Sequence, residues 1–86
     1  MPKPELIERV RQVQTELGKT QPTPATRDEI ERMRQTIELA VKQPEHANLR
    51  SLHERIERVA SGFEAAHPKL ATLLNGLATE LAAAGL

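Results

Sequence analysis

The sequence of 86 residues contains no cysteine and only one aromatic residue, Phe63. The chain therefore has no disulfide and no thiol nucleophile. It is also short enough that the burial of apolar surface only just offsets the entropy of ordering the backbone. Because neither disulfides nor large rings supply the difference, we expect self-association, in the simplest case a homodimer. The absence of cysteine also fits a reducing compartment.

The chain has no excess charge of either sign, because 12 Lys and Arg residues balance 12 Asp and Glu residues. It therefore lacks the field that gathers proteins onto nucleic acid or an anionic membrane. Aromatic stacking platforms and glycine-rich phosphate loops are absent as well. There is no signal-peptide core, and no run approaches the ~20 apolar residues of a membrane span. We expect a cytoplasmic protein with neither nucleic-acid nor membrane partners.

Charge is scarce in the last quarter of the chain, where Ala65 to Leu86 includes only Lys69 and Glu80 as charged residues. A helix with so little charge is expected to be covered. Helical spacing gives this segment two stripes about 100° apart on the helix axis. The first stripe is Leu70, Leu73, Leu74, Leu77 and Leu81, and the second is Ala71, Asn75, Ala78 and Ala82. Two contact faces predict at least two neighbours for this helix.

Proline and glycine divide the chain into four amphipathic segments, and we predict helices over about residues 4–17, 27–42, 49–66 and 68–84. Gly18 is predicted to end the first helix in a left-handed conformation. The connector 19–25, which contains two prolines, is predicted to be extended. Thr26 and Glu29 have the spacing of a capping box at the start of the second helix.

The remaining boundaries are predicted from single residues. Pro44 should stop the second helix, and Asn48 should cap the third. His67-Pro68 is the last break, and the sequence leaves open whether it is a kink or a tight corner. Gly85 is predicted to end the fourth helix in a left-handed conformation, with Leu86 folding back against Leu81.

These segments predict a single all-α domain over residues 1–86, in which an N-terminal helical hairpin packs on a C-terminal helix pair to form a bundle of three or four helices. The third segment carries apolar residues at three-four spacing, as in a short coiled-coil seam. We expect either this seam or the leucine stripe to meet a second copy, and the sequence does not decide which face is core and which is interface. The predicted interface residues are Leu49, Leu52, Ile56, Val59, Phe63, Leu70, Leu73, Leu74, Leu77 and Leu81.

The sharpest chemical feature is Glu64-x-x-His67, a spacing by which bundle helices present two metal ligands on one face. A complete di-metal site needs a second such pair and two more inward carboxylates, which the apolar stripes of the first two segments do not offer. The alternative is that His67 caps the third helix while Glu64 is solvated or pairs locally with a basic residue. We predict no bound metal or other cofactor, and keep a metal- or ligand-binding bundle as the alternative function.

The other candidate side chains do not form a recognisable catalytic site. His46 and His53 are expected to be solvent-exposed, with His53 beside Glu57 on the next turn. Neither Ser51 nor Ser61 lies in a strained turn with a histidine and carboxylate relay. We therefore expect a non-enzymatic protein–protein interaction module, whose heteromeric partner, if it has one, the sequence does not identify.

Residues 63–70 carry the motif Phe-Glu-Ala-x-His-Pro-x-Leu, preceded by Leu52-His53-Glu54-Arg55 and followed by a Leu/Ala helix that closes on Ala84-Gly85-Leu86. This pattern resembles a family of small bacterial helical proteins, domain of unknown function 4404. The C-terminal half matches well and the N-terminal hairpin loosely, with a connector at residues 19–25 that is longer than the family pattern. The resemblance implies a short, all-helical, cytoplasmic bacterial protein. It supplies no activity, substrate or catalytic residue.

Overall fold

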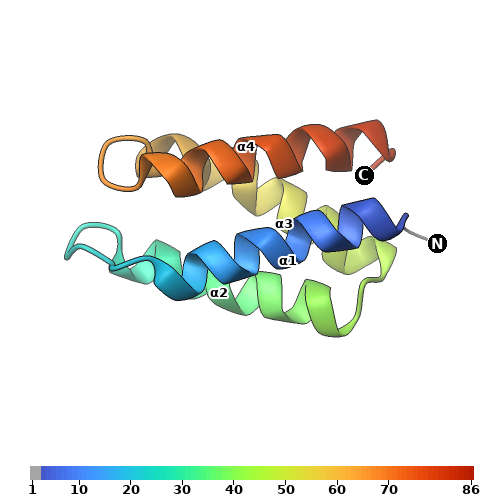
Figure 1. Ribbon diagram of the computed structural model, residues 1–86, viewed down its shortest axis with the longest axis horizontal. Coiled ribbons are helices and arrows are strands. Elements are labelled where there is room, and N and C mark those ends of the chain that lie inside the picture. The colour runs from blue at the N-terminus through green and yellow to red at the C-terminus, as the bar shows by residue number, and fades with distance from the viewer. Residues whose placement is uncertain (1–2) are drawn as a thin grey trace.

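The computed structural model describes residues 3–86 and contains four α-helices: α1 (Pro4–Lys19), α2 (Arg27–Lys42), α3 (His46–Val59) and α4 (Pro68–Ala83). A short 3-10 helix, η1 (Ala60–Phe63), follows α3 directly. Each helix packs on its neighbours in sequence, and α4 closes the ring by packing on α1 (Figure 1). The predicted all-α bundle is confirmed, with four helices rather than three.

The core lies on the central axis of this ring, and every helix contributes one apolar face to it. Because each face is built at three-four spacing, consecutive turns bury side chains on the same side of the helix. The residues with no exposed surface are Val10, Val13, Ile30, Met33, Ile37, Ala40, Leu52, Leu74, Leu77 and Leu81. Within residues 3–86, no buried side-chain nitrogen or oxygen lacks a hydrogen-bond partner. The core is therefore apolar and closed.

The end of α1 differs from the prediction, because Gly18 is an ordinary residue within the helix, which continues to Lys19. The last carbonyl groups are satisfied by Thr20, whose hydroxyl donates to the carbonyl oxygen of Glu16 and whose amide donates to that of Leu17, and by a side chain of α2. The Arg34 guanidinium of α2 donates to the carbonyl oxygens of Leu17 at 3.0 Å and Thr20 at 3.1 Å. A left-handed glycine is not needed where a side chain from the neighbouring helix takes the carbonyls.

Two predicted caps are also wrong. Thr26 does precede α2, but its side chain makes no capping bond to the helix, so the predicted box with Glu29 is not formed. Asn48 lies inside the first turn of α3, which begins earlier than predicted, at His46. The Asn48 side-chain amide donates to the carbonyl oxygen of Gln43 at 2.7 Å, and so ties α3 to the end of α2.

The third helix ends at Val59 rather than at residue 66. The chain tightens into η1 at Ser61-Gly62 and then turns over residues 64–66. Glycine weakens a helix because it has the most conformational freedom to lose, which explains the early end of α3. His67-Pro68 is consequently part of a corner between two antiparallel neighbours (Figure 1).

Three boundaries predicted from the backbone chemistry of single residues are confirmed. Helix α2 ends at Lys42, two residues before Pro44, and α4 begins at Pro68. Gly85 has φ +83° and is the one residue with positive φ in the described part of the chain. The amide of Leu86 donates to the carbonyl oxygen of Leu81 at 2.9 Å, and the amide of Gly85 donates to that of Ala82 at 3.0 Å, as a Schellman ending requires.

None of the helices described is both long enough and apolar enough to cross a membrane.

Candidate functional site

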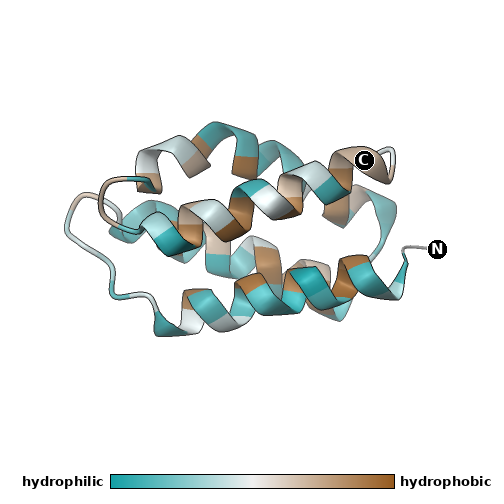
Figure 2. Ribbon diagram, turned by 45° about the horizontal axis from the view of Figure 1, so that its top comes forward, coloured by the Kyte–Doolittle hydropathy of each residue, from teal (hydrophilic) through white to brown (hydrophobic). Residues whose placement is uncertain are grey.

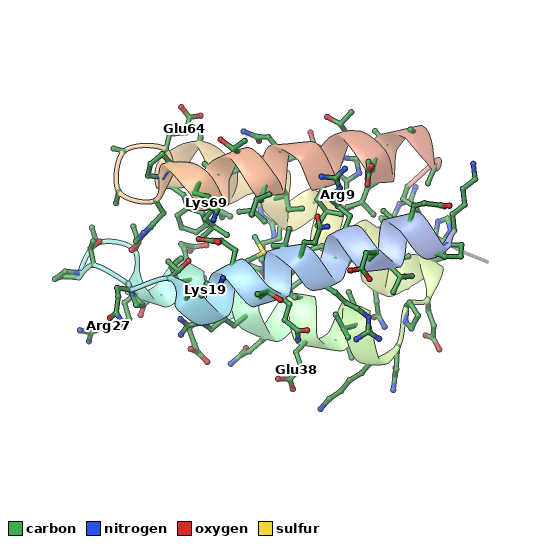
Figure 3. The ribbon with its side chains drawn as sticks, in the orientation of Figure 1. Arg9, Lys19, Arg27, Glu38, Glu64 and Lys69 are labelled. Carbon is green, nitrogen blue, oxygen red and sulfur yellow. The ribbon has the colours of Figure 1, made fainter. Side chains whose placement is uncertain are left out.

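Glu64 and His67, the candidate residues of the metal-binding alternative, do not lie in a cluster of metal ligands within the described part of the chain. Glu64 is exposed in the turn after η1, and Figure 3 shows its side chain pointing away from the bundle. His67 precedes α4, and its Nε2 atom lies 2.8 Å from the hydroxyl of Thr26. No group of three or more His, Asp or Glu side chains among residues 3–86 is placed to hold a metal ion. No observation favours metal binding.

The other two histidines differ from each other. His46 is exposed, as expected, at the first residue of α3. The expectation of exposure is wrong for His53, whose side chain is only 14% exposed and whose Nε2 atom lies 3.0 Å from a carboxylate oxygen of Glu57. The cause is its position on the flank of α3, where it lines a groove against α4.

The predicted interface residues form the intrachain core. Of the ten, eight are buried, and Val59 and Leu73 are partly buried against the same cluster. The closed ring explains this, because the α3 seam and the α4 leucines face the same axis and cover each other together with α1 and α2. In the folded chain these residues are covered, fully or in part, by other helices of the same chain.

The face of α4 that remains open is uncharged. Its members are exposed, small, and confined to proline, threonine, asparagine and alanine. We call this set the outer face of α4: Pro68, Thr72, Asn75, Thr79, Ala82 and Ala83. In Figure 2, α4 is mostly pale or brown, whereas α1 is banded with teal.

The two charged residues of α4 are both engaged by α1. Arg9 donates two hydrogen bonds to the Glu80 carboxylate, at 3.1 and 3.2 Å. Lys69 Nζ lies 3.5 Å from a carboxylate oxygen of Glu16. Arg9 and Lys69 lie along the seam between the two helices (Figure 3). Charge on α4 is thus confined to the flank that α1 already covers.

The opposite flank of α4 borders a shallow groove with α3. Small residues line part of it, among them Ala60, Ser61 and Ala78, and the α3 side and the turn after it also carry His53, Glu57 and Glu64. The α4 side of this groove includes residues of the second stripe predicted for the helix. Ala71 of that stripe is buried and Ala78 is half-buried, whereas Asn75 and Ala82 are exposed. The predicted second neighbour is therefore α3, and it covers only half of the stripe.

The sequence signal for the outer face of α4 was present but was interpreted differently. Scarcity of charge after Ala65 predicts a covered helix with at least two neighbours. The structure shows a helix that is covered on its leucine side and open on its small-residue side.

Comparison with known proteins identifies one matching family. Neither the curated proteins nor the solved structures include a match to this chain. The model of a family described as a domain of unknown function, DUF4404, matches residues 6–86. This range includes all of α2, α3 and α4 and most of α1. The chain therefore belongs to the DUF4404 family of domains of unknown function.

Proposed function

We propose that this protein is a non-catalytic protein–protein interaction module that self-associates through the outer face of α4. The observation that supports this proposal is the absence of charge from that face, in a chain of which 28% is charged. Covering charged groups is costly because each must lose its hydration. The outer face of α4 carries no such cost along the length of a 16-residue helix.

A second copy is the occupant that fits this face best. A two-fold contact places the same patch on both sides, so an uncharged patch meets an uncharged patch. The side chains are small, with none larger than asparagine, and allow two helices to approach closely. The formal net charge of the chain is zero, so two copies do not repel each other as wholes.

The size of the face predicts weak association. A 16-residue helix is about 24 Å long and presents a face about 10 Å wide, or about 240 Å² on each copy. Stable interfaces cover about 800 Å² on each partner, so a larger contact would extend into the groove beside Ala60 and Ala78, whose rim includes Glu57 and Glu64 and is therefore more costly to cover than the outer face. We expect a transient dimer with a Kd on the order of 100 μM.

Sedimentation over a concentration series tests the proposal, with Thr79→Arg as the disrupting variant. Thr79 lies in the middle of the outer face, and an arginine there would have to be desolvated in the dimer. Gln35→Arg is the matched control, because Gln35 is exposed on α2, which does not contact α4.

The wild type and Gln35→Arg are expected to rise from the 9.6 kDa chain mass toward twice that value as concentration increases, while Thr79→Arg stays at 9.6 kDa. A wild type that stays at the chain mass up to about 1 mM, roughly ten times the expected Kd, would overturn the proposal. So would a Thr79→Arg variant that associates as the wild type does.

A further inference from the structure

Two connections that are distant in sequence meet at one end of the bundle. The α1–α2 connection and the turn before α4 lie at the end opposite the two termini (Figure 1). The side chains that join them are Thr26 and His67, with Thr26 Oγ1 2.8 Å from His67 Nε2. Thr26 is the one buried polar residue in the part of the chain described, at 8% exposure. Its hydroxyl therefore depends on protein partners.

Thr23 supplies the remaining partners of this hydroxyl. The Thr23 amide donates to Thr26 Oγ1 at 3.0 Å, and the two threonine hydroxyls lie 3.0 Å apart. In return, the Thr26 amide donates to Thr23 Oγ1 at 3.2 Å. The ring of His67 also packs edge-on against Phe63, with 6.0 Å between ring centroids, which fixes the imidazole from a second side.

The Thr26 hydroxyl can make all of its hydrogen bonds when Nε2 of His67 is an acceptor. The Thr23 hydroxyl donates to Thr26, and the Thr26 hydroxyl donates to His67. Thr26 Oγ1 then accepts two hydrogen bonds and donates one, which is the full capacity of a hydroxyl.

The Thr26 hydroxyl can also make all of its hydrogen bonds when Nε2 of His67 carries a proton. His67 then donates to Thr26, and the Thr26 hydroxyl reverses and donates to Thr23. Thr26 Oγ1 again accepts two hydrogen bonds and donates one. The hydroxyl proton of Thr23 is released toward solvent, since Thr23 is only half-buried.

We propose that Thr23 and Thr26 form a reversible pair of hydroxyl groups that keeps His67 hydrogen-bonded in both its neutral and its protonated form. The pair makes the junction between the α1–α2 connection and the turn before α4 tolerant of pH, although this junction depends on a histidine. Without the Thr23 hydroxyl, protonated His67 would leave the buried Thr26 proton with no acceptor, and an unpaired buried donor destabilises the fold. This inference is independent of the proposed self-association.

Several charged groups lie close to His67 along the chain and across the helix seam. Glu64 and Lys69 flank it in sequence, Arg27 follows Thr26, and Glu16 of α1 pairs with Lys69. All of them are retained in the variants below, as are the other two histidines. Their contributions to stability therefore cancel when a variant is compared with the wild type at the same pH.

Urea unfolding of Thr23→Val at about pH 8 and about pH 5, on either side of the range in which imidazole titrates, tests the proposal. Valine removes the hydroxyl and keeps the backbone amide and the shape. The folding equilibrium constant of the variant relative to wild type is expected to fall by a further factor of about ten at the lower pH, or about 1.4 kcal/mol. If the folding equilibrium constant of Thr23→Val relative to wild type were the same at the two pH values, the proposal would be overturned.

Two controls separate this effect from a general cost of removing a hydroxyl. Thr15→Val removes an exposed hydroxyl that donates to the carbonyl of Arg11, and its ratio to wild type should not change with pH. In a His67→Gln background, Thr23→Val should lose its pH dependence, because glutamine does not titrate. The same fall with pH in either control would contradict the assignment to His67.

A measurement on the wild type covers the case in which Thr23→Val does not fold. In nitrogen–proton NMR spectra at about pH 5, the Nε2 proton of His67 is expected to exchange more slowly with water than that of the exposed His46, because Thr26 accepts it in a part-buried bond. Rapid exchange of this proton in the folded protein would show that protonation breaks the bond, and would overturn the proposal.

Discussion

Helices α2 and α4 lie diagonally across the bundle and have the same length of 16 residues, but their solvent faces differ in charge. Six of the eight exposed residues of α2 are charged: Arg27, Asp28, Glu31, Arg32, Glu38 and Lys42. Among the seven exposed residues of α4 only Lys69 is charged, and it is paired with Glu16. Their inner faces do not differ in this way, because both are apolar and buried.

The charged face of α2 does little for stability. Lys42 lies 3.2 Å from Glu38 and Arg32 lies 3.6 Å from Glu29, but exposed pairs of this kind contribute only about 0.3–0.5 kcal/mol each. What the charges do is keep the face hydrated, since covering it would desolvate every one of them. The comparison teaches that buried apolar faces stabilise the fold in both helices. Of the two, only α4 has an outer face that a partner could cover without desolvating charged side chains.

The largest expected effect is the difference in lost stability between truncating a buried leucine of α4 and truncating an exposed leucine of α2. Leu77→Ala in α4 should lower the free energy of unfolding by about 2–5 kcal/mol, because Leu77 has no exposed surface and its loss leaves a cavity. Leu39→Ala in α2 should change it by less than about 0.5 kcal/mol, since Leu39 is 47% exposed. Urea denaturation measures both. Similar losses in the two variants would mean that the inner faces do not carry the stability.

The next effect concerns two glycines of the C-terminal segment. Gly85→Ala should lower the free energy of unfolding by about 1–2 kcal/mol, because φ +83° is strained for a residue with a Cβ atom. Gly76→Ala should raise it by about 0.5–1 kcal/mol, because alanine favours the helix and its Cβ meets no atom within 4 Å. Thermal melts of the matched pair check the opposite signs. A stabilising Gly85→Ala would contradict the Schellman ending.

The smallest effect concerns the ion pair between α1 and α4. Glu80→Gln should lower the free energy of unfolding by no more than about 1 kcal/mol, because the side chains of Arg9 and Glu80 are 40% and 38% exposed. Glu38→Gln on α2 should have a still smaller effect, near 0.3 kcal/mol, since its pair is more exposed. Denaturation at low and high salt compares them. An equal loss of unfolding free energy in the two variants would show that the ion pair between α1 and α4 contributes no more than an exposed pair within one helix.

Sequence reasoning succeeded where a residue acts through its own backbone. Pro44 and Pro68 set helix boundaries because proline has no amide hydrogen and a fixed φ, and Gly85 ends α4 because it tolerates positive φ. It failed where the deciding partner comes from another helix. Arg34 of α2 contributes to the end of α1 in place of a left-handed Gly18, and the Thr26 hydroxyl bonds His67 and Thr23 instead of capping α2.

The candidate site shows the same limit. The leucine stripes were found from their spacing, but which of them is core was left open, because the helix that covers a stripe is fixed only by the closed ring of four helices. The scarcity of charge in α4 was visible in the sequence. Which side of the helix it leaves open became clear only when Lys69 and Glu80 were placed against α1.

The most direct test of the central claim is a map of backbone amide NMR shifts of the wild type over a dilution series. The outer face of α4 should account for the concentration-dependent shifts, with the largest changes at Thr72, Thr79 and Ala82, while the exposed residues of α2 do not move. Shifts confined to α2, or spectra that do not change up to about 1 mM, roughly ten times the expected Kd, would contradict the claim that the uncharged face of α4 is a contact surface.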